Sequence, residues 1–415
     1  MMINKYNLLK RLGPLIVLSK NNAIIAALSY FLTITIANYL GPEQFGVYSH
    51  ALITASIASI FINFGTEQTA AVLYSHSRDS HDVFNNIFFT RIVVAIPVCA
   101  ILMIIYLDDL TLLVFIYCLV LTSFNLAFLY EIRRRYEKYS YIYLLERIAY
   151  IGLAFLLIYL TWLKLSYLFA LILFSNAASL LYQLIDNKGI VLLDQERLFS
   201  NVLNTLNENY PLVVTAISAY AYGGFSRLIL ERHLGSGMFG IYSAGWQLVA
   251  VGTIFQGQVS RLWRSPISDA VSALDSKELY NVFQSYVLIT TIPLVFACFF
   301  FVFFPDMVIA LLFTDHYADL ASVVPILGIY LVVINIAGLV DMLWVALRRR
   351  AIYMWTNLIF SVMLLGFLWL YAPRMGMFEF AATTVTFHFL TTVVLAIIWL
   401  RIFRLHAIDA KAKEY

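Results

Sequence analysis

The sequence is dominated by apolar runs of about twenty residues, each long enough to cross the roughly 30 Å hydrocarbon core of a bilayer as a helix. With 62% hydrophobic and 12% charged residues over 415 positions, one soluble core could not bury so much apolar surface. The sequence therefore predicts an all-α integral membrane protein with about twelve transmembrane helices. The expected spans are residues 21–39, 47–71, 87–107, 110–130, 142–162, 165–185, 209–230, 240–262, 282–304, 323–346, 352–371 and 378–400.

A ten-residue segment after the first run returns after the seventh. Residues 40–49 read LGPEQFGVYS and residues 234–243 read LGSGMFGIYS, identical at six of ten positions and offset by 194 residues. In both copies glycines interrupt the apolar run, which predicts a tight helical hairpin whose glycines permit an unusual backbone angle or a close helix contact. The repeat predicts two six-helix bundles, 1–185 and 209–415, joined by a cytoplasmic linker at 186–208. Because each half has an even number of spans, the halves should be parallel.

The placement of Lys and Arg predicts the orientation. On the twelve-helix interpretation, 23 of the 27 Lys and Arg residues lie on one side. The positive-inside rule makes that side the cytoplasm, so both termini are expected there. The exceptions are Lys164, Arg227, Arg232 and Arg374. The net charge of +3 is too small to indicate nucleic-acid binding.

The second half carries about twenty extra residues before its triple arginine, because 133–135 and 348–350 are 215 residues apart rather than 194. The extra stretch, 305–320, has no counterpart in the first half, and we expect a short amphipathic segment on the outer surface. Its polar residues do not have a spacing that specifies a metal site, so a solvated loop face is favoured and neither metal nor cofactor is expected. These residues are Asp306, Asp315, His316 and Asp319.

The hairpin LGPEQFGVYS, the later RLILERHLGSGMFGIYSA and the twelve spans in two parallel halves resemble the O-antigen flippases, the Wzx group of polysaccharide exporters. Their superfamily also contains the multidrug and toxin extrusion (MATE) transporters and the lipid II flippases. The resemblance implies a MATE-like fold in the bacterial inner membrane. It also implies that an undecaprenyl-diphosphate-linked oligosaccharide is translocated by alternating access, without covalent chemistry or catalytic residues. A polysaccharide polymerase and a chain-length regulator are the partners that it implies.

A diphosphate cannot cross hydrocarbon alone, because moving its charge away from hydrogen-bonding partners costs many kcal/mol. Cations lining a water-filled cavity would remove most of that cost, and Arg suits phosphate because its planar fork binds two oxygens. Ionisable residues within spans are therefore candidates for the site. The candidate cations for substrate binding are Arg227, Arg261, Arg91 and Lys20.

Each candidate also has a structural interpretation. Arg227 is followed by Glu231 at the i,i+4 spacing of a helical salt bridge. Arg261 occupies the position equivalent to Glu67 after the 194-residue offset. This pair of opposite charges could line the cavity or lie at the membrane interface and snorkel.

Arg91 and Lys20 lie near the ends of spans, where a snorkelling contact with lipid phosphate is slightly favoured. Asp341 and His388 lie deeper and are candidates for coupling or pairing. The imidazole could relay protons near neutral pH, although a hydrogen bond between helices is the more common role.

Two other functions remain open. A multidrug or cation antiporter of the same superfamily would share the fold but carry acidic binding residues, and an organic-cation transport assay separates the two. A membrane polysaccharide polymerase or ligase would also have about a dozen spans. Such enzymes carry a long periplasmic loop, whereas the outer connections here are short apart from 305–320.

Overall fold

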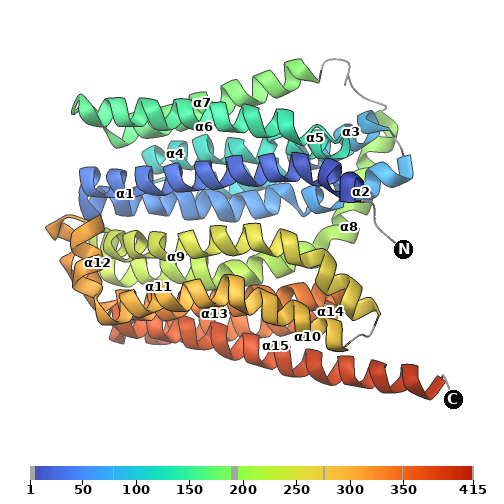
Figure 1. The fold of residues 1–415 in the computed structure, drawn as a ribbon. Coiled ribbons are helices and arrows are strands. Elements are labelled where there is room, and N and C mark those ends of the chain that lie inside the picture. Colours follow the sequence, from blue (N-terminus) through green and yellow to red (C-terminus); the bar gives the residue numbers. More distant parts are fainter. Residues whose placement is uncertain (1–4, 78, 188–194, 274–275, 348, 414–415) are drawn as a thin grey trace. The chain divides into compact units, whose positions relative to one another are not determined.

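The computed structural model describes residues 5–77, 79–187, 195–273, 276–347 and 349–413, and every regular element among them is a helix (Figure 1). Ten stretches in this part of the chain are long and apolar enough to span a membrane. Two of them, Ile24–Ala70 and Val202–Ala250, have 47 and 49 residues. At about 1.5 Å per residue each covers two crossings. The prediction of an all-α membrane protein with about twelve spans is confirmed.

Both double-length stretches bend at the repeated hairpin. Gly41 (φ 75°, ψ 170°) and Gly235 (φ 79°, ψ 171°) are the non-helical residues inside them. A side chain would be strained at these positive φ angles, so glycine is needed to turn the chain. The predicted hairpins are therefore present in both halves.

The chain divides into two compact units. Unit 1 comprises residues 1–40 and 47–217, and unit 2 comprises Gly41–Gly46 and Ser218–Tyr415. The elements of unit 1 are α1 (Lys5–Asn63), α2 (Thr66–Ser77), α3 (Ser80–Ile105), α4 (Leu110–Val120), η1 (Leu121–Phe124), α5 (Ala127–Ile132), α6 (Tyr136–Tyr159), α7 (Leu165–Asp186) and most of α8 (Gln195–Tyr220).

Unit 2 begins within the last turn of α8. Its further elements are η2 (Ala221–Phe225), α9 (Ser226–Ser272), α10 (Ser276–Tyr286), η3 (Val287–Thr291), α11 (Ile292–Phe303), α12 (Pro305–Leu312), η4 (Asp315–Ser322), α13 (Val324–Leu347), α14 (Arg350–Tyr371), η5 (Ala372–Arg374) and α15 (Met377–Lys413).

The linker expected at 186–208 lies partly outside the described residues, which resume at α8. This helix runs without a break into the seventh predicted span. Within unit 1 it is bonded to α3 and α2, by hydrogen bonds from Thr205 to Asn86 (3.0 Å) and from Asn209 to Thr69 (3.2 Å).

Several predicted spans are interrupted. The second breaks between α1 and α2, where Phe64 (φ 43°) and Gly65 (φ 68°) both have positive φ. The fourth breaks between α4 and α5, through the 3₁₀ turn η1. The seventh and ninth contain the π-helical turns η2 and η3. Such breaks free backbone carbonyls inside the membrane region, where each needs a hydrogen-bond partner.

Unit 2 contains both hairpin turns in contact, since Gly41–Gly46 belongs to it. A Cβ atom on Gly46 would overlap the backbone carbonyl of Ser236, and one on Gly240 would overlap that of Pro42. The two copies of the repeat thus pack backbone against backbone, a contact that only glycine permits.

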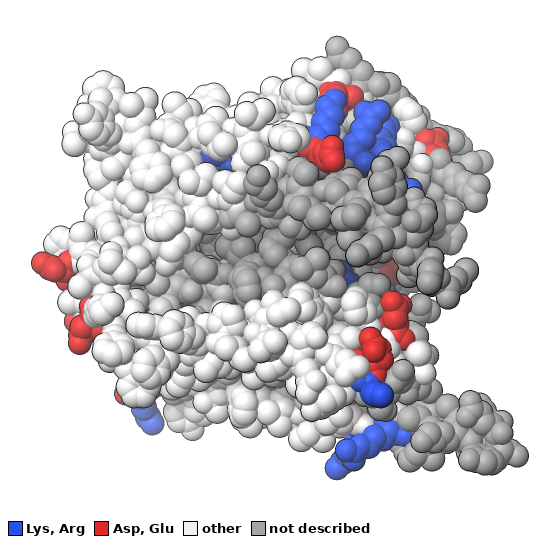
Figure 2. Space-filling view, viewed as in Figure 1, with Lys and Arg blue, Asp and Glu red and all other residues white. Residues whose placement is uncertain are grey.

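The extra stretch of the second half forms the short helices α12 and η4. It is not wholly solvated, because Tyr317 and Leu320 are fully buried. Burial raises the pKa of the Tyr317 phenol. On the visible face of the molecule the described side chains are mostly uncharged, and the charged ones gather towards the helix ends (Figure 2). That distribution fits helices that lie in hydrocarbon.

Candidate substrate-binding site

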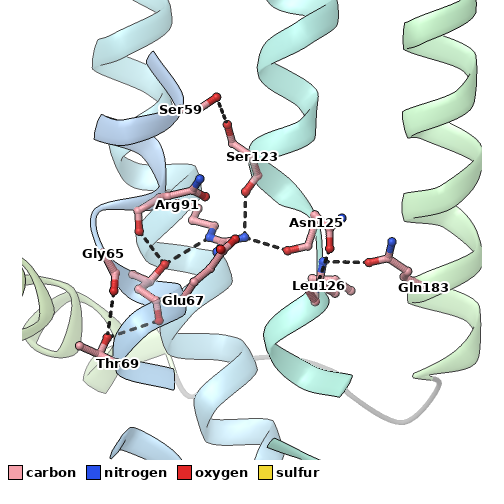
Figure 3. A network of polar contacts seen from close by, with 12 residues as sticks. Ser59, Gly65, Glu67, Thr69, Arg91, Ser123, Asn125, Leu126 and Gln183 are labelled. Carbon is pink, nitrogen blue, oxygen red and sulfur yellow. Dashed lines mark hydrogen bonds and ion pairs between the residues drawn. The ribbon is translucent and has the colours of Figure 1, made fainter. Parts of the chain in front are cut away.

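Arg91 of α3 is at the centre of a polar network in unit 1, and its side chain is completely buried (Figure 3). Its Nε donates to Thr66 Oγ1 (3.3 Å), and its Nη1 donates to the carbonyl oxygens of Ser123 and Asn125 (2.8 Å each). Its Nη2 donates to Glu67 Oε1 at 3.1 Å. The guanidinium also lies 5.3 Å from the centre of the Phe128 ring.

The partners of Arg91 lie at two helix breaks. Thr66 and Glu67 begin α2 after the break at Gly65, and Ser123 and Asn125 lie between α4 and α5. The arginine therefore satisfies backbone and side-chain acceptors that the broken helices leave unpaired. The Arg91 guanidinium therefore already donates to four acceptor groups of the protein.

Two polar cavities lie near this network within unit 1. The first has a volume of about 230 Å³, and we name it the amide cavity because Asn125, Asn176 and Gln183 line it. Glu67, Tyr139, Tyr143, Glu146 and Arg147 are also in its wall. The second, of about 220 Å³, is the hydroxyl cavity, and its hydroxyl-bearing residues are Ser29, Thr33, Tyr48, Ser56, Ser59, Thr122 and Tyr150.

Arg147 of α6 lines both cavities, together with Thr122 and Asn176. Its side chain is 28% exposed, whereas that of the neighbouring Glu146 is 8% exposed. The Nε of Arg147 is 3.8 Å from Glu146 Oε1, beyond hydrogen-bond distance. This Nε has no hydrogen-bond partner among the described residues, and the guanidinium lies 5.1 Å from the centre of the Tyr143 ring.

Arg147 was not among the candidates that the sequence indicates, because its position near the start of the fifth predicted span places it with the cytoplasmic charges. A signal was present, since Glu146 and Arg147 both lie inside the run 142–162. In the structure they lie within the candidate span Glu137–Tyr159. Charges within a span that face a polar cavity are the ones expected to meet a polar ligand.

The cation candidate of unit 2, Arg227, is 9% exposed and lies in the first turn of α9. Its Nε donates to the carbonyl of Gly223 in η2, and its guanidinium lies 4.9 Å from the centre of the Trp246 ring. The aromatic face and the carbonyl fix the side chain without neutralising its charge. Glu231 lies one turn further along α9 and is half-buried.

His388 and Asp341, the deeper candidates, each take part in a contact between helices of unit 2. The His388 Nδ1 and the Tyr330 hydroxyl are hydrogen-bonded at 2.9 Å, and Tyr222 stacks on the imidazole with ring centres 4.3 Å apart. The hydroxyl of Tyr353 donates to Asp341 Oδ1 at 2.6 Å. These contacts join α15 to α13 and α14 to α13.

Two candidates cannot be assigned contacts. Lys20 lies in α1 and Arg261 in α9, and both side chains lie outside the described part of the structure. Among the described residues, no group of three or more His, Cys, Asp or Glu side chains could hold a metal ion.

The fold is that of a class of membrane transporters. A lipid II flippase (MurJ) in an inward closed conformation superposes with a TM-score of 0.71 at 13% identity, covering 96% of this chain and 93% of that chain. An inward-facing multidrug resistance MATE transporter of the MOP superfamily gives 0.68 at 14% identity, covering 94% and 96%. A MOP superfamily transporter from Pyrococcus furiosus, whose binding pocket is described as having reverse polarity, gives 0.62 at 12% identity, covering 94% and 95%.

Residues 15–259 match the family described as polysaccharide biosynthesis protein. The match spans more than half of the chain, so the protein belongs to this family. No curated protein sequence matches the chain significantly. The family and the transporter fold agree with the resemblance to polysaccharide exporters that the sequence indicates.

Proposed function

We propose that the protein translocates an oligosaccharide linked through a diphosphate to a polyprenyl lipid, the substrate class of O-antigen export. The family supports a role in polysaccharide biosynthesis, and the fold supports transport. The proposed location is the bacterial inner membrane, with both termini in the cytoplasm. A polysaccharide polymerase and a chain-length regulator are the proposed partners.

The observation that carries the proposal is the position of Arg147 in the wall shared by two polar cavities. A diphosphate needs a cation that it can reach, and the Arg147 side chain is 28% exposed, with one carboxylate neighbour at 3.8 Å and a buried Nε that has no hydrogen-bond partner among the described residues. Amides and hydroxyls line the rest of the two cavities, and these groups hydrogen-bond well to sugars. We therefore propose that the diphosphate binds at Arg147 and that the first sugars occupy the adjoining cavities.

Arg91 has a different proposed role from the one that the sequence suggests. Its buried guanidinium already has four protein acceptors, so we propose that it fixes the helix breaks rather than binding substrate. Arg227 remains a proposed substrate cation in unit 2, because its recorded partners are a carbonyl and an aromatic ring rather than a carboxylate. Lys20 and Arg261 remain candidates from the sequence alone.

Complementation tests the proposal. Arg147→Gln, expressed at the wild-type level in a strain that lacks its own flippase, should lose most of its surface polysaccharide on a gel. Arg147→Lys should keep part of it, because charge is retained while the two-oxygen geometry is lost. The exposed Arg374 of η5 supplies the control, and Arg374→Gln should export normally. Full-length polysaccharide from well-expressed Arg147→Gln would remove Arg147 from the substrate site.

A second function is favoured by one observation. Glu67 and Glu146 both line the amide cavity, beside the aromatic rings of Tyr139 and Tyr143. Carboxylates and aromatic faces together suit an organic cation, as in a multidrug antiporter. Uptake of an organic cation into vesicles, abolished by Glu146→Gln, would favour this alternative over the flippase.

A further inference from the structure

Unit 2 contains a third cavity that is unlike the other two. Its volume is about 620 Å³, and it lies among α10, η3, α13 and α15. Nearly all of its lining is apolar, with Phe283, Leu339, Leu343, Trp399 and Phe403 among the residues that form it. Water is poorly accommodated in an apolar space of this kind.

Among the described residues, one charged side chain lines this cavity. Arg404, near the end of the candidate span Met377–Arg404, is in its wall and is exposed. The lining residues of α15 run from Ala396 to Arg404. At 1.5 Å per residue they cover about 12 Å. That length is most of one leaflet of a hydrocarbon core roughly 30 Å thick, so the cavity is a groove with an apolar floor and a cation at one end.

The groove is open to the membrane and is not a packing defect of the core. Tyr280, Phe283 and Leu400 line it and are 60%, 45% and 48% exposed. Its floor is fixed, because Trp399 Nε1 donates to the Leu343 carbonyl (2.9 Å) and the Trp399 ring stacks on Phe403 with centres 4.8 Å apart. The groove therefore has a defined floor, while its rim faces hydrocarbon.

The helix that forms one wall is locally distorted. Val287 and Thr291, the first and last residues of the π-turn η3, both line the groove. A π-turn carries one residue more per turn than an α-helix and is often found at functional sites. A network of Tyr286, Thr291 and Asn335 holds it in place, with Asn335 Nδ2 donating to Thr291 Oγ1 at 2.9 Å and Tyr286 donating to Asn335 Oδ1 at 3.0 Å.

We infer that this groove of unit 2 binds one anionic phospholipid, with an acyl chain along the apolar floor and the phosphate on Arg404. The shape and charge match that molecule, because a phospholipid places an anionic group at the end of an apolar chain within one leaflet. The proposal is independent of the transported substrate, since the described residues that line the groove all lie in unit 2 and none of them lies in the wall of the amide or hydroxyl cavity.

Native mass spectrometry of the full-length protein in detergent tests the inference, with phosphatidylglycerol and phosphatidylcholine as the added probes. The wild type should retain one phosphatidylglycerol in preference to phosphatidylcholine. Arg404→Gln should lose that preference at least tenfold. Leu343→Trp, which fills the groove, should reduce the retention of both lipids. The control is Arg401→Gln, on the same helix but outside the lining, and it should behave as the wild type.

Leu343→Trp could disturb folding, so its melting temperature is measured beside that of Leu343→Phe, a smaller filling. A graded loss of lipid at an unchanged melting temperature supports the groove as the site. Equal retention in the wild type, Arg404→Gln and Leu343→Phe would overturn the inference. Displacement of phosphatidylglycerol by an equimolar polyprenyl phosphate would overturn the assignment to phospholipid and indicate the carrier lipid in its place.

Discussion

Arg91 and Arg147 are two arginines within membrane-spanning helices of the same unit, yet their surroundings differ in kind. Arg91 is completely buried and donates to four different residues. Arg147 is 28% exposed, lines two cavities and leaves its Nε unpaired. The difference shows that a charged residue inside a span need not bind substrate. At a broken helix, backbone and side-chain acceptors can take up the N–H donors of a guanidinium, as they do for Arg91.

One residue, Glu67, belongs both to the network of Arg91 and to the wall of a cavity that Arg147 lines. Glu67 accepts from Arg91 and lines the amide cavity, so the structural network forms part of the wall of the candidate site. A change at Arg91 can therefore reach the cavity indirectly, and stability must be measured beside transport in every variant.

The largest effect is expected for Arg91→Gln. The substitution leaves the carbonyls of Ser123 and Asn125 without their donor in a buried region, at a cost of about 3 to 5 kcal/mol. Arg91→Lys should recover little, because one ammonium cannot bridge both helix breaks. Thermal unfolding of the purified protein in detergent measures the loss, with Arg374→Gln as the control. Wild-type stability of Arg91→Gln would remove the distinction between the two arginines.

A smaller loss of stability is expected at the hairpin of unit 2, where one glycine is tightly packed and another has open space around it. Gly240→Leu should destabilise by about 1 to 3 kcal/mol, because the new side chain must displace the backbone near Pro42. Gly237 is the matched control, since a Cβ there would meet nothing within 4 Å. Gly237→Ala should leave protein level and surface polysaccharide unchanged, and equal losses in both variants would show that the close backbone contact does not matter.

A modest effect is expected for Glu67→Gln. The side chain is 51% exposed, so solvent screens its ion pair with Arg91, and the loss of stability should be below about 1 kcal/mol. The amide can still accept the hydrogen bond from Arg91. If the melting temperature instead fell as far as in Arg91→Gln, the carboxylate rather than the backbone carbonyls would be the main partner of Arg91.

The smallest effect on stability is expected for Arg147→Gln, which should change it by less than about 1 kcal/mol. The residue is partly exposed, and its Nε makes no hydrogen bond that the substitution would break. Thermal unfolding beside Arg91→Gln checks this ranking. A loss comparable to that of Arg91→Gln would make Arg147 a second structural arginine.

Much of the fold could be predicted from the sequence because bilayer thickness sets the length of each apolar run. The repeat around Gly41 and Gly235 predicted the hairpins, since a turn of this kind requires positive φ. The helix breaks were not predicted. Short polar stretches mark both of them, NFGTEQT at 63–69 in the run 47–71 and TSFN at 122–125 in the run 110–130. The length of the surrounding apolar runs still indicated uninterrupted helices, and tertiary partners such as Arg91 make the breaks tolerable.

The candidate site was less predictable than the fold. Sequence spacing pairs Arg227 with Glu231, whereas the recorded partners of the Arg227 guanidinium are Gly223 and Trp246. Arg147 was missed because a charge near the end of a span normally snorkels to the interface. Cavity walls are built from residues of several helices, so the sequence alone does not show which residues form the wall shared by the two polar cavities.

The central claim is that the cation of the substrate site is Arg147 and not Arg91. The most direct test is the equilibrium affinity of the purified protein for a short-chain prenyl-diphosphate oligosaccharide, measured for the wild type, Arg147→Lys and Arg147→Gln. The account predicts affinity at least tenfold weaker in Arg147→Gln, a difference of about 1.4 kcal/mol or more, with Arg147→Lys in between. Equal affinity in all three proteins, at unchanged melting temperature, would contradict it.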